Sequence, residues 1–393
     1  MSPKVLYVGG FELPDKNAAA HRVISIGKIF RELKYDVYYI GVSKYLENRN
    51  SNIRDTQNVF NGFTYYSYPY PGKNTQWIKY LCSIPYIDLI EDIKPDIIVA
   101  YNFPSIALNK LRKYCKRHSI KIIADITEWY QAEGSIFFRI IKNIDTFLRM
   151  RVIHKKMDGL IPISKYLHNY YRQYSNNIIE IPPLVDLSDE KWDNFGCNTI
   201  SPDAPIQLIY AGSPGGKDQL LKIILALKEI RHKVIINFTI IGISKEQFKL
   251  KYDDINAEMM SYLDSFVVFI EHLPHLDVIN HIKHSDFTIF IRPETLVNTA
   301  GFPTKFVESI SSGTPVITNL SSNLTEYLKD GINGFILNID NDKKFISSLS
   351  RAFLCTKEQI TTLKDNCRKI KSFDYREYLE SFKLFIERTN SST

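Results

Sequence analysis

The chain has 393 residues, of which 44% are hydrophobic and 24% are charged, so it is long enough for two domains with full cores and has the composition of an ordinary soluble globular protein. Its five cysteines are scattered and never form a C-x-x-C pair, which argues against a disulfide framework or a zinc site and for a reducing cytosol. The net charge of +7 permits contact with anionic lipid or a phosphorylated substrate, whereas nucleic acid is not expected, because the 24 Tyr and 23 Phe fall mostly in strand and helix patterns.

Apolar strands alternate with amphipathic helices along the first half of the chain. We expect strands at 4–10, 36–42, 96–101, 121–126 and 159–164, with helical patterns between them. Continuous β-branched strands separated by helices predict a parallel sheet with both faces covered. The first of these strands runs into a glycine turn and is not a signal peptide, and the longest apolar runs are too short to span a bilayer.

A polar stretch without periodicity separates the two halves, and the strand pattern then begins again. We interpret residues 188–204 as a linker and expect further strands at 206–212, 234–242, 265–270, 287–292 and 314–318. The sequence therefore predicts an α/β protein with two Rossmann-like, doubly wound parallel-sheet domains, at 1–187 and 205–372. Residues 373–393 are expected to form an amphipathic helix that packs back on the N-terminal domain.

Three cationic stretches of the second domain follow predicted strands. Because ligands bind outside the carboxyl ends of strands in open parallel sheets, these stretches are candidates for a binding site. A glycine-rich turn lets backbone N–H groups approach a phosphate, and a lysine adds charge. The alternatives are that the first stretch is only a turn and that the arginine of the second closes a loop salt bridge. The three stretches are Gly212–Asp218, Arg292–Pro293 and Gly301–Glu308.

The third stretch begins a short predicted helix. Pro303 fits the first helical position, and Gly313 fits the C-cap. Lys305 and Glu308 are three residues apart, so they lie on one face, one turn into this helix. A helix N-terminus with an added cation is suited to hold a phosphate, and the alternative is a surface salt bridge between the two side chains.

These stretches lie in segments that resemble a known family. The second half is similar to the donor domain of a GT-B glycosyltransferase, and of glycosyltransferase family 4 (group 1) in particular. The first half resembles that family more weakly, at Gly9–Gly10, 157–171 and 178–186. The resemblance implies the GT-B fold, in which an N-terminal acceptor-binding domain and a C-terminal nucleotide-sugar-binding domain face a cleft. The segments that carry it are LIYAGSPGGKDQLLKIILAL, VVFIEHLPHLDVINHIKHSDFTIFIRPE and AGFPTKFVESISSGTPVITNLSSNLTEYLKDGINGFIL.

The family implies retaining transfer of a sugar from a nucleotide donor without a metal. Of its two signature glutamates, the second matches Glu308, which would hold the ribose hydroxyls, and the first falls at Ala300, which cannot make its contact with the sugar. The loop resembles a branch of the family whose lysine, here Lys305, contacts the donor phosphates. Lys217 and Lys305 would then stabilise the leaving diphosphate. The residues expected to line the donor site are Gly9, Gly10, Gly212, Ser213, Gly216, Arg292, Gly301, Phe302, Pro303 and Thr304.

Acceptor chemistry is expected from the loop after the strand at 121–126. Asp125 or Glu128 could orient or deprotonate an acceptor hydroxyl, and Trp129 and Tyr130 could stack on a sugar ring. The alternative is a helix cap with aromatic residues packed into the core. Likewise, Gly9 and Gly10 either approach the transferred sugar or form a tight turn without a ligand. The chain's clustered histidines fit no zinc spacing, so no metal site is expected.

Basic residues alternate with apolar ones at 137–159, and the helix at 109–118 adds further cations. Such helices either lie on an anionic membrane surface or present a solvated face. We expect a cytoplasmic enzyme, peripheral at the inner face of the plasma membrane, that moves a sugar to a saccharide or polyprenyl-linked acceptor in surface polysaccharide or glycolipid synthesis. The alternative is a nucleotide-sugar-binding subunit with little catalytic activity. The basic residues are Lys110, Arg112, Lys113, Lys116, Arg117, Arg139, Lys142, Arg149, Arg151, Lys155 and Lys156.

Overall fold

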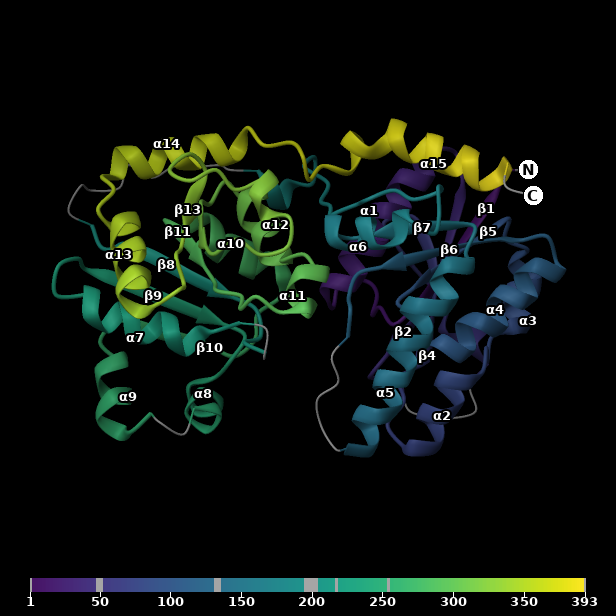
Figure 1. The fold of residues 1–393 in the computed structure, drawn as a ribbon, viewed down its shortest axis with the longest axis horizontal. Coiled ribbons are helices and arrows are strands. Elements are labelled where there is room, and N and C mark those ends of the chain that lie inside the picture. The colour runs from purple at the N-terminus through teal and green to yellow at the C-terminus, as the bar shows by residue number, and fades with distance from the viewer. Residues whose placement is uncertain are drawn as a thin grey trace. The chain divides into compact units, whose positions relative to one another are not determined.

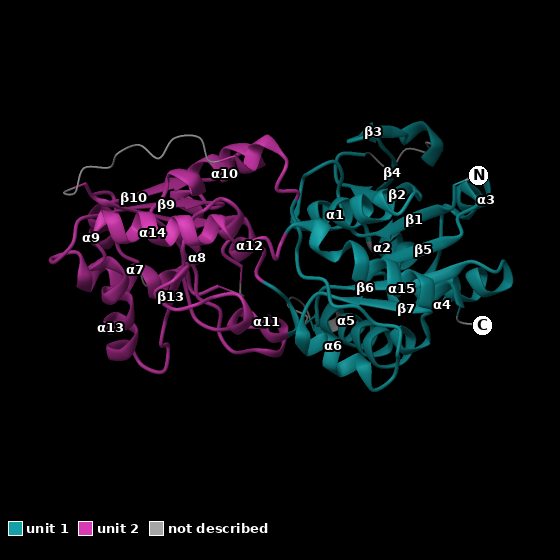
Figure 2. Cartoon of the chain, turned by 90° about the horizontal axis from the view of Figure 1, so that it is seen from above, with its two compact units in different colours: residues 1–185, 300–302, 374–393 teal, residues 186–299, 303–373 magenta. Residues whose placement is uncertain are grey.

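The computed structural model describes residues 2–46, 52–130, 136–193, 204–215, 218–252 and 255–391 (Figure 1). The chain divides into two compact units, which Figure 2 draws in different colours. Unit 1 consists of residues 1–185, 300–302 and 374–393, and unit 2 of residues 186–299 and 303–373. Among the described helices, none combines the length and the hydropathy that a transmembrane span requires.

Unit 1 is built on a seven-stranded sheet in the order β3-β4-β2-β1-β5-β6-β7. All neighbouring strands are parallel except β3 and β4, which pair antiparallel. Between β1 and β2 the register aligns Tyr7 with Tyr39, so their side chains lie on the same face. The strands are β1 (Lys4–Gly9), β2 (Asp36–Ser43), β3 (Asn58–Phe60), β4 (Phe63–Pro69), β5 (Ile97–Tyr101), β6 (Lys121–Ile126) and β7 (Gly159–Pro162).

One hydrophobic core of unit 1 joins this sheet face to the first and last helices. Tyr7 and Tyr39 are fully buried in it, and Phe30 of α1 meets Phe382 of α15 edge to face, with ring centroids 4.9 Å apart. Figure 1 shows α15, in yellow, running back over this unit. The helices are α1 (Ala18–Glu32), α2 (Asn74–Cys82), α3 (Ile87–Ile93), α4 (Ser105–Arg117), α5 (Ile136–Leu148), α6 (Lys165–Arg172) and α15 (Leu379–Ser391), with short turns η1 (Ile53–Thr56), η2 (Arg149–Ile153), η3 (His154–Lys156) and η6 (Tyr375–Tyr378).

Unit 2 is built on a six-stranded, wholly parallel sheet in the order β10-β9-β8-β11-β12-β13. The order reverses between β8 and β11, which makes that point the topological switch where open parallel sheets bind ligands. The strands are β8 (Ile206–Ala211), β9 (Ile236–Ile241), β10 (Val267–Ile270), β11 (Phe287–Ile289), β12 (Val316–Thr318) and β13 (Gly334–Ile336). The helices are α7 (Leu220–Ile230), α8 (Lys245–Lys251), α9 (Ala257–Leu263), α10 (His275–His284), α11 (Leu296–Ala300), α12 (Thr304–Ser311), α13 (Asp342–Phe353) and α14 (Lys357–Arg368), with turns η4 (Glu190–Trp192) and η5 (Leu324–Glu326).

The structure confirms the predicted fold class of two doubly wound parallel sheets. Each predicted strand is present, although several are shorter; for example, the strand expected at 287–292 ends at Ile289. The sequence analysis missed β3, β4 and β13. Of the predicted linker, residues 194–203 lie outside the described residues, and Trp192 just before them is buried.

Candidate active site

The chain turns tightly after β8, at the switch point of unit 2. Gly212 follows β8 with φ +115°, a conformation that favours glycine. A Cβ at this position would lie 2.8 Å from Cε of Lys305, and a Cβ at Gly242 would lie 2.5 Å from the carbonyl carbon of Gly212. Glycine therefore lets the backbone after β8 lie directly against the backbone after β9 and the lysine side chain of α12.

A cluster of charged side chains lies beside this turn, and its centre is Asp218. The Asp218 carboxylate accepts a hydrogen bond from the Lys305 amine and one of 2.7 Å from the Tyr210 hydroxyl. Nε of Arg292 lies 3.4 Å from the other carboxylate oxygen. The Lys305 amine also sits 3.8 Å from the centre of the Tyr210 ring, where the negative face of the ring attracts it. The strand ends β8 and β11 and the first turn of α12 thus bring two cations to one carboxylate.

Burial sets the electrostatics of this cluster. It lowers the pKa of Lys305 to about 8, although Asp218 acts in the opposite direction. Burial alone would raise the pKa of Asp218, but Lys305 and Arg292 outweigh it, so this pKa lies below its ordinary value. The pKa of Tyr210 is raised by burial and by the neighbouring carboxylate. At neutral pH the cluster therefore contains two cations, one carboxylate and a neutral phenol.

The cluster is largely shielded from solvent, but some of its hydrogen-bonding groups have no partner. The side chains of Lys305 and Arg292 keep 13% and 12% of their surface exposed, against 5% for Asp218. Nε of Arg292 and Oδ1 of Asp218 make no hydrogen bond, although they lie 3.4 Å apart. The backbone of Arg292 is fixed by Asn319, whose amide accepts from its N–H at 2.9 Å and donates to its carbonyl at 2.7 Å. A positioned cation with an unused N–H is a group that can bind an anion.

Lys305 and Glu308 of the short helix α12 do not pair with each other. Lys305 contacts Asp218, and Glu308 lies 3.3 Å from Nε2 of His275, which begins α10. The alternative of a surface salt bridge is therefore wrong. The helix begins at Thr304 with Pro303 as N-cap, one residue later than predicted, and Gly313 follows its end with φ +71°.

The other expected donor-site residues differ in their exposure. Ser213 is exposed, Gly301, Phe302 and Pro303 are buried, and Thr304 is half-buried. Gly216 and Lys217 lie outside the described residues, so the role expected of Lys217 stays a prediction.

Ala300 occupies the position of the family's first glutamate. It is buried, and its carbonyl accepts a hydrogen bond of 2.7 Å from the Ser164 hydroxyl; both residues belong to unit 1. Ser164 also caps α6, as its place before that helix suggests.

At the equivalent strand ends of unit 1, Gly9 has a packing role. A Cβ there would lie 2.4 Å from the carbonyl oxygen of Tyr101 on the neighbouring strand β5, so glycine allows the two strands to pair. Gly10 is exposed, and a Cβ there would meet only the Tyr80 hydroxyl, at 3.5 Å. Of the two glycines, Gly10 has room for a ligand.

Asp125 does not face an acceptor site. It is 0% exposed and accepts hydrogen bonds of 2.7 Å and 2.9 Å from the Arg22 guanidinium and of 2.6 Å from the Tyr7 hydroxyl. The remaining Arg22 nitrogen donates to the carbonyls of Ile181 and Pro182. A carboxylate held in this way is a structural ion pair, so we do not retain the acid–base role expected of Asp125.

The loop after β6 is lined by aromatic residues. Trp129 packs edge to face on Tyr170, with centroids 5.1 Å apart, and the Tyr130 hydroxyl lies 3.4 Å from the Asn102 amide. Glu128, which lies between β6 and Trp129 in the sequence, is half-buried. The packing alternative therefore describes Trp129, whereas Glu128 as a residue remains partly exposed.

Arg149 lies beneath this loop, although the sequence analysis expected it on a basic surface. It is 2% exposed, donates one hydrogen bond of 3.0 Å to the Asn102 carbonyl, and lies 4.9 Å from the centre of the Tyr130 ring. Its Nε and Nη2 have no hydrogen-bond partner, and no carboxylate of the described residues pairs with it. Burial of an unpaired charge is costly, so this guanidinium is a second candidate for anion binding.

Comparison with known proteins agrees with this geometry. Residues 198–369 match the family model described as Glycosyl transferases group 1. The fold is similar to sucrose-phosphate synthase from Thermosynechococcus elongatus, with a TM-score of 0.75 at 12% identity over 99% of this chain and 100% of that one. It is also similar to a glycosyltransferase from Rickettsia africae (TM-score 0.69, 13% identity, 100% of both chains) and to the catalytic domain of starch synthase IV from Arabidopsis thaliana (TM-score 0.68, 13% identity, 100% of both chains). No curated protein matches by sequence. The chain is a glycosyltransferase of the GT-B type.

Sequence reasoning missed several residues of this glycosyltransferase. Tyr210, Asn319 and His275 lie within the segments that resemble the family, but the resemblance assigned no role to them. Asp218 lies in the glycine turn that was singled out, but a carboxylate beside a predicted phosphate site gave no signal of its own. The only signal for Arg149 was its charge, and its burial depends on the tertiary fold.

Proposed function

We propose that the chain is a retaining, family 4-type glycosyltransferase that moves a sugar from a nucleotide-sugar donor to a saccharide or lipid-linked acceptor, in the synthesis of a surface polysaccharide or glycolipid. The observation that carries the proposal is the cluster of Lys305 and Arg292 around Asp218, beside the Gly212 turn at the switch point of unit 2. The architecture fits a diphosphate, because two positioned cations lie beside the glycine turn.

The cluster suits a leaving group whose negative charge grows during the reaction. Lys305 and Arg292 would stabilise the departing diphosphate, and Asp218 holds Lys305 in place until the ligand arrives. Glu308, with His275 beside it, would accept hydrogen bonds from the ribose hydroxyls. Two neighbours support a nucleotide-sugar donor: starch synthase IV is bound to ADP, and a trehalose-6-phosphate protein of E. coli is bound to UDP-2-fluoro glucose.

The acceptor would bind at the strand ends of unit 1. Glu128 is the remaining candidate to orient its hydroxyl, and the unpaired Arg149 supports an acceptor with an anionic group near that hydroxyl. The Arg149→Gln variant should slow transfer to anionic acceptors while hydrolysis of the donor by water continues at the parent rate. Equal loss of both rates would contradict this role of Arg149.

The decisive experiment for the proposed function is to test a panel of nucleotide sugars. A thermal shift with each donor identifies the ligand that stabilises the folded protein. The rate at which nucleoside diphosphate is released from that donor then separates an efficient enzyme from the alternative, a nucleotide-sugar-binding subunit with little catalytic activity, which Ala300 supports. Proton NMR of the product shows whether the anomeric configuration is retained, and an inverted product would reject the retaining mechanism.

We further propose that the reaction needs no metal. The cations that would neutralise the diphosphate are side chains, Lys305 and Arg292, and within the described ranges no three metal-ligating side chains come together. Activity should therefore survive EDTA. Complete loss on chelation, with recovery when Mg²⁺ is added, would contradict this proposal.

Peripheral membrane attachment is proposed from α5. Its apolar residues include Ile136, Ile140, Ile144 and Phe147, which are between 53% and 76% exposed, and Arg139 on the same helix is also exposed. A helix with exposed apolar and basic residues fits the interface of an anionic bilayer. Binding to vesicles that contain phosphatidylglycerol should weaken in the Ile140→Ser variant and with salt, and absence of binding at low salt would reject it.

A further inference from the structure

Unit 1 contains a basic pocket away from the candidate active site. The pocket has a volume of about 400 Å³, within the range of small-molecule sites. It lies at the amino end of β6, where Lys121 and Ile122 begin the strand, whereas Asp125 and Glu128 lie toward or beyond its carboxyl end. The residues that line it are Arg112, Lys116, Ser119, Ile120, Lys121, Ile122, Lys156 and Asp158.

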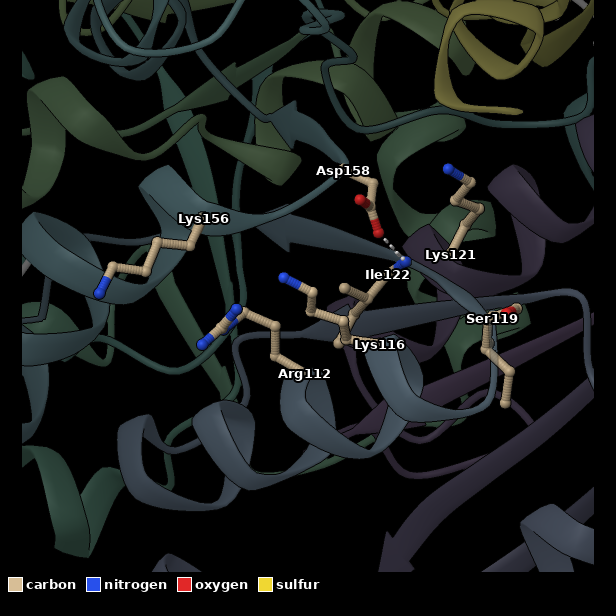
Figure 3. A pocket seen from close by; sticks show the side chains of 8 residues that line it. Arg112, Lys116, Ser119, Lys121, Ile122, Lys156 and Asp158 are labelled. Atoms are coloured by element: carbon tan, nitrogen blue, oxygen red, sulfur yellow. Dashed lines mark hydrogen bonds between the residues drawn. The ribbon is translucent and has the colours of Figure 1, made fainter. Parts of the chain in front are cut away.

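The cations of the pocket come from separate elements of the fold. Arg112 and Lys116 are one turn apart on α4, and Lys156 ends η3. In Figure 3 the charged ends of these three side chains lie on one side of the Asp158 carboxylate, and Lys121 extends away from them. Arg112 and Lys116 on α4 and Lys156 at the end of η3 thus bring three cations to the lining of one pocket.

The pocket contains little negative charge to balance them. Asp158 is the single carboxylate in its lining, and one of its oxygens accepts a hydrogen bond of 2.7 Å from the Ile122 N–H. Among the described residues, none pairs as an ion with Arg112, Lys116 or Lys156; Arg112 only contacts the Asn109 amide, at 3.3 Å. The C-terminus of α4 offsets about half a unit charge, which is less than the excess of cations.

We propose that this pocket is a second anion site, which binds the phosphate or diphosphate group of a small molecule. Arg112 offers a planar pair of donors and the lysines offer point charges, which is the combination that phosphate oxygens accept. Ile120 and Ile122 provide an apolar wall for the rest of the ligand. The pocket lies at the amino end of β6, opposite to the end near Glu128, and none of its lining residues belongs to unit 2.

The test is calorimetric titration with inorganic pyrophosphate at low salt, and α4 offers a matched control. The pocket variant is Arg112→Ala with Lys116→Ala. The control variant is Lys113→Ala with Arg117→Ala, which removes the same charge from exposed positions of the same helix that do not line the pocket. The Lys305→Ala variant removes the competing diphosphate contact in unit 2.

We expect pyrophosphate binding that persists in Lys305→Ala, weakens at least about tenfold in the pocket variant, and changes little in the control variant. Equal weakening in the pocket and control variants would mean general surface electrostatics and would overturn the proposal. Circular dichroism and thermal melting of the pocket variant test whether it remains folded. The pocket variant should also bind the nucleotide-sugar donor as the parent does. This second measurement shows whether a negative result concerns the pocket or the proposed donor site.

A second arm identifies the source of the phosphate. Vesicles of phosphatidylcholine with phosphatidic acid present the same group on a lipid. If these vesicles bind through the pocket residues and pyrophosphate does not, the phosphate site stands and its ligand is a lipid headgroup. If neither probe distinguishes the pocket variant from the control variant, the pocket has no phosphate site.

Discussion

The two sheets of the protein carry the same small motif with different outcomes. In unit 1, Asp125 accepts from the Tyr7 hydroxyl at 2.6 Å and from Arg22; in unit 2, Asp218 accepts from the Tyr210 hydroxyl at 2.7 Å and from Lys305. In unit 1 the cation and carboxylate are 3% and 0% exposed, and each is fully hydrogen-bonded. In unit 2 both cations retain contact with water, and the Arg292 and Asp218 atoms that face each other are unsatisfied.

This difference teaches how to separate a structural ion pair from a binding site. Both contain a carboxylate that accepts hydrogen bonds from a cation and from a tyrosine, so residue type does not distinguish them. What distinguishes them is whether the hydrogen-bonding capacity of the cations is used. A saturated pair in a closed environment contributes to the fold, and an unsaturated pair that is open to solvent can still exchange its partner for a ligand.

We call the ion pair of Asp125 and Arg22 the closed pair, and the cluster of Lys305 and Arg292 around Asp218 the open pair. The largest effect is expected when the closed pair is broken. Asp125→Asn leaves the Arg22 charge buried without a counter-ion, which should cost about 3–5 kcal/mol of unfolding free energy. Asp218→Asn should cost less, because Lys305 and Arg292 can recover water. Urea unfolding measures both changes, with Asp15→Asn at an exposed position of unit 1 as control. A larger loss for Asp218→Asn would reverse our assignment of the two pairs.

Next in size is the effect of the cation at the open pair. Lys305→Ala should weaken nucleoside diphosphate by about 1.5–3 kcal/mol, the range for a hydrogen bond to a charged group, and leave the nucleoside alone unchanged. Turnover at saturating donor should fall as well, since charge on the diphosphate grows in the transition state. Lys228→Ala, on an exposed position of α7, is the control. Parent-like affinity and turnover would show that Lys305 only pairs with Asp218.

A smaller effect is expected at Glu308. The Glu308→Gln variant should weaken nucleoside and diphosphate alike by about 1.5 kcal/mol, because both carry the ribose that the carboxylate would hold. Titration of both ligands into the variant distinguishes this role from one at the phosphates. A loss confined to the diphosphate would place Glu308 elsewhere in the site.

The smallest expected effect is a pH dependence that belongs to the open pair alone. The pKa of Lys305 is about 8 in the free protein, so the amine is charged below that pH and neutral above it. A bound diphosphate favours the charged form, and the affinity should therefore fall by up to about tenfold as the pH rises from about 7 to about 9. Titrations across this range should show no such fall in Lys305→Ala. A fall of the same size in that variant would assign the titration to another group.

The hydrophobic periodicity and the composition of the sequence were sufficient to predict the two sheets and the helices that cover them. Alternating β-branched strands and amphipathic helices predicted both parallel sheets, because burial on two faces leaves a strong apolar signal. Of the missed strands, β3 lacks that signal because it is mostly exposed, and β13 is short and begins with Gly334, a residue type that is depleted in strands. The ends of strands were also placed too late, since apolar residues such as Phe290 continue past β11 in the buried loop.

The candidate site was predictable only as a location. The rule that ligands bind at the carboxyl ends of strands indicated Lys305 and Arg292, but it indicated Asp125 equally well. The partner of each charge comes from residues far away in sequence, 87 positions for Lys305 and Asp218 and 103 for Arg22 and Asp125. The local sequence carries no information on such pairs. It therefore could not indicate that Asp125 is buried in an ion pair with Arg22, or that Arg149 is buried.

The return of α15 to unit 1 has a consequence for the order in which the protein is made. Phe382 and Phe385 are fully buried in the same core as β1 and α1, and a Cβ at Gly159 would lie 2.7 Å from the Phe385 ring. A chain that emerges from the ribosome with its N-terminus first can therefore complete unit 2 while unit 1 still lacks part of its core. The later half of the nascent chain should become resistant to protease first, and the N-terminal half only after the final helix has been synthesised.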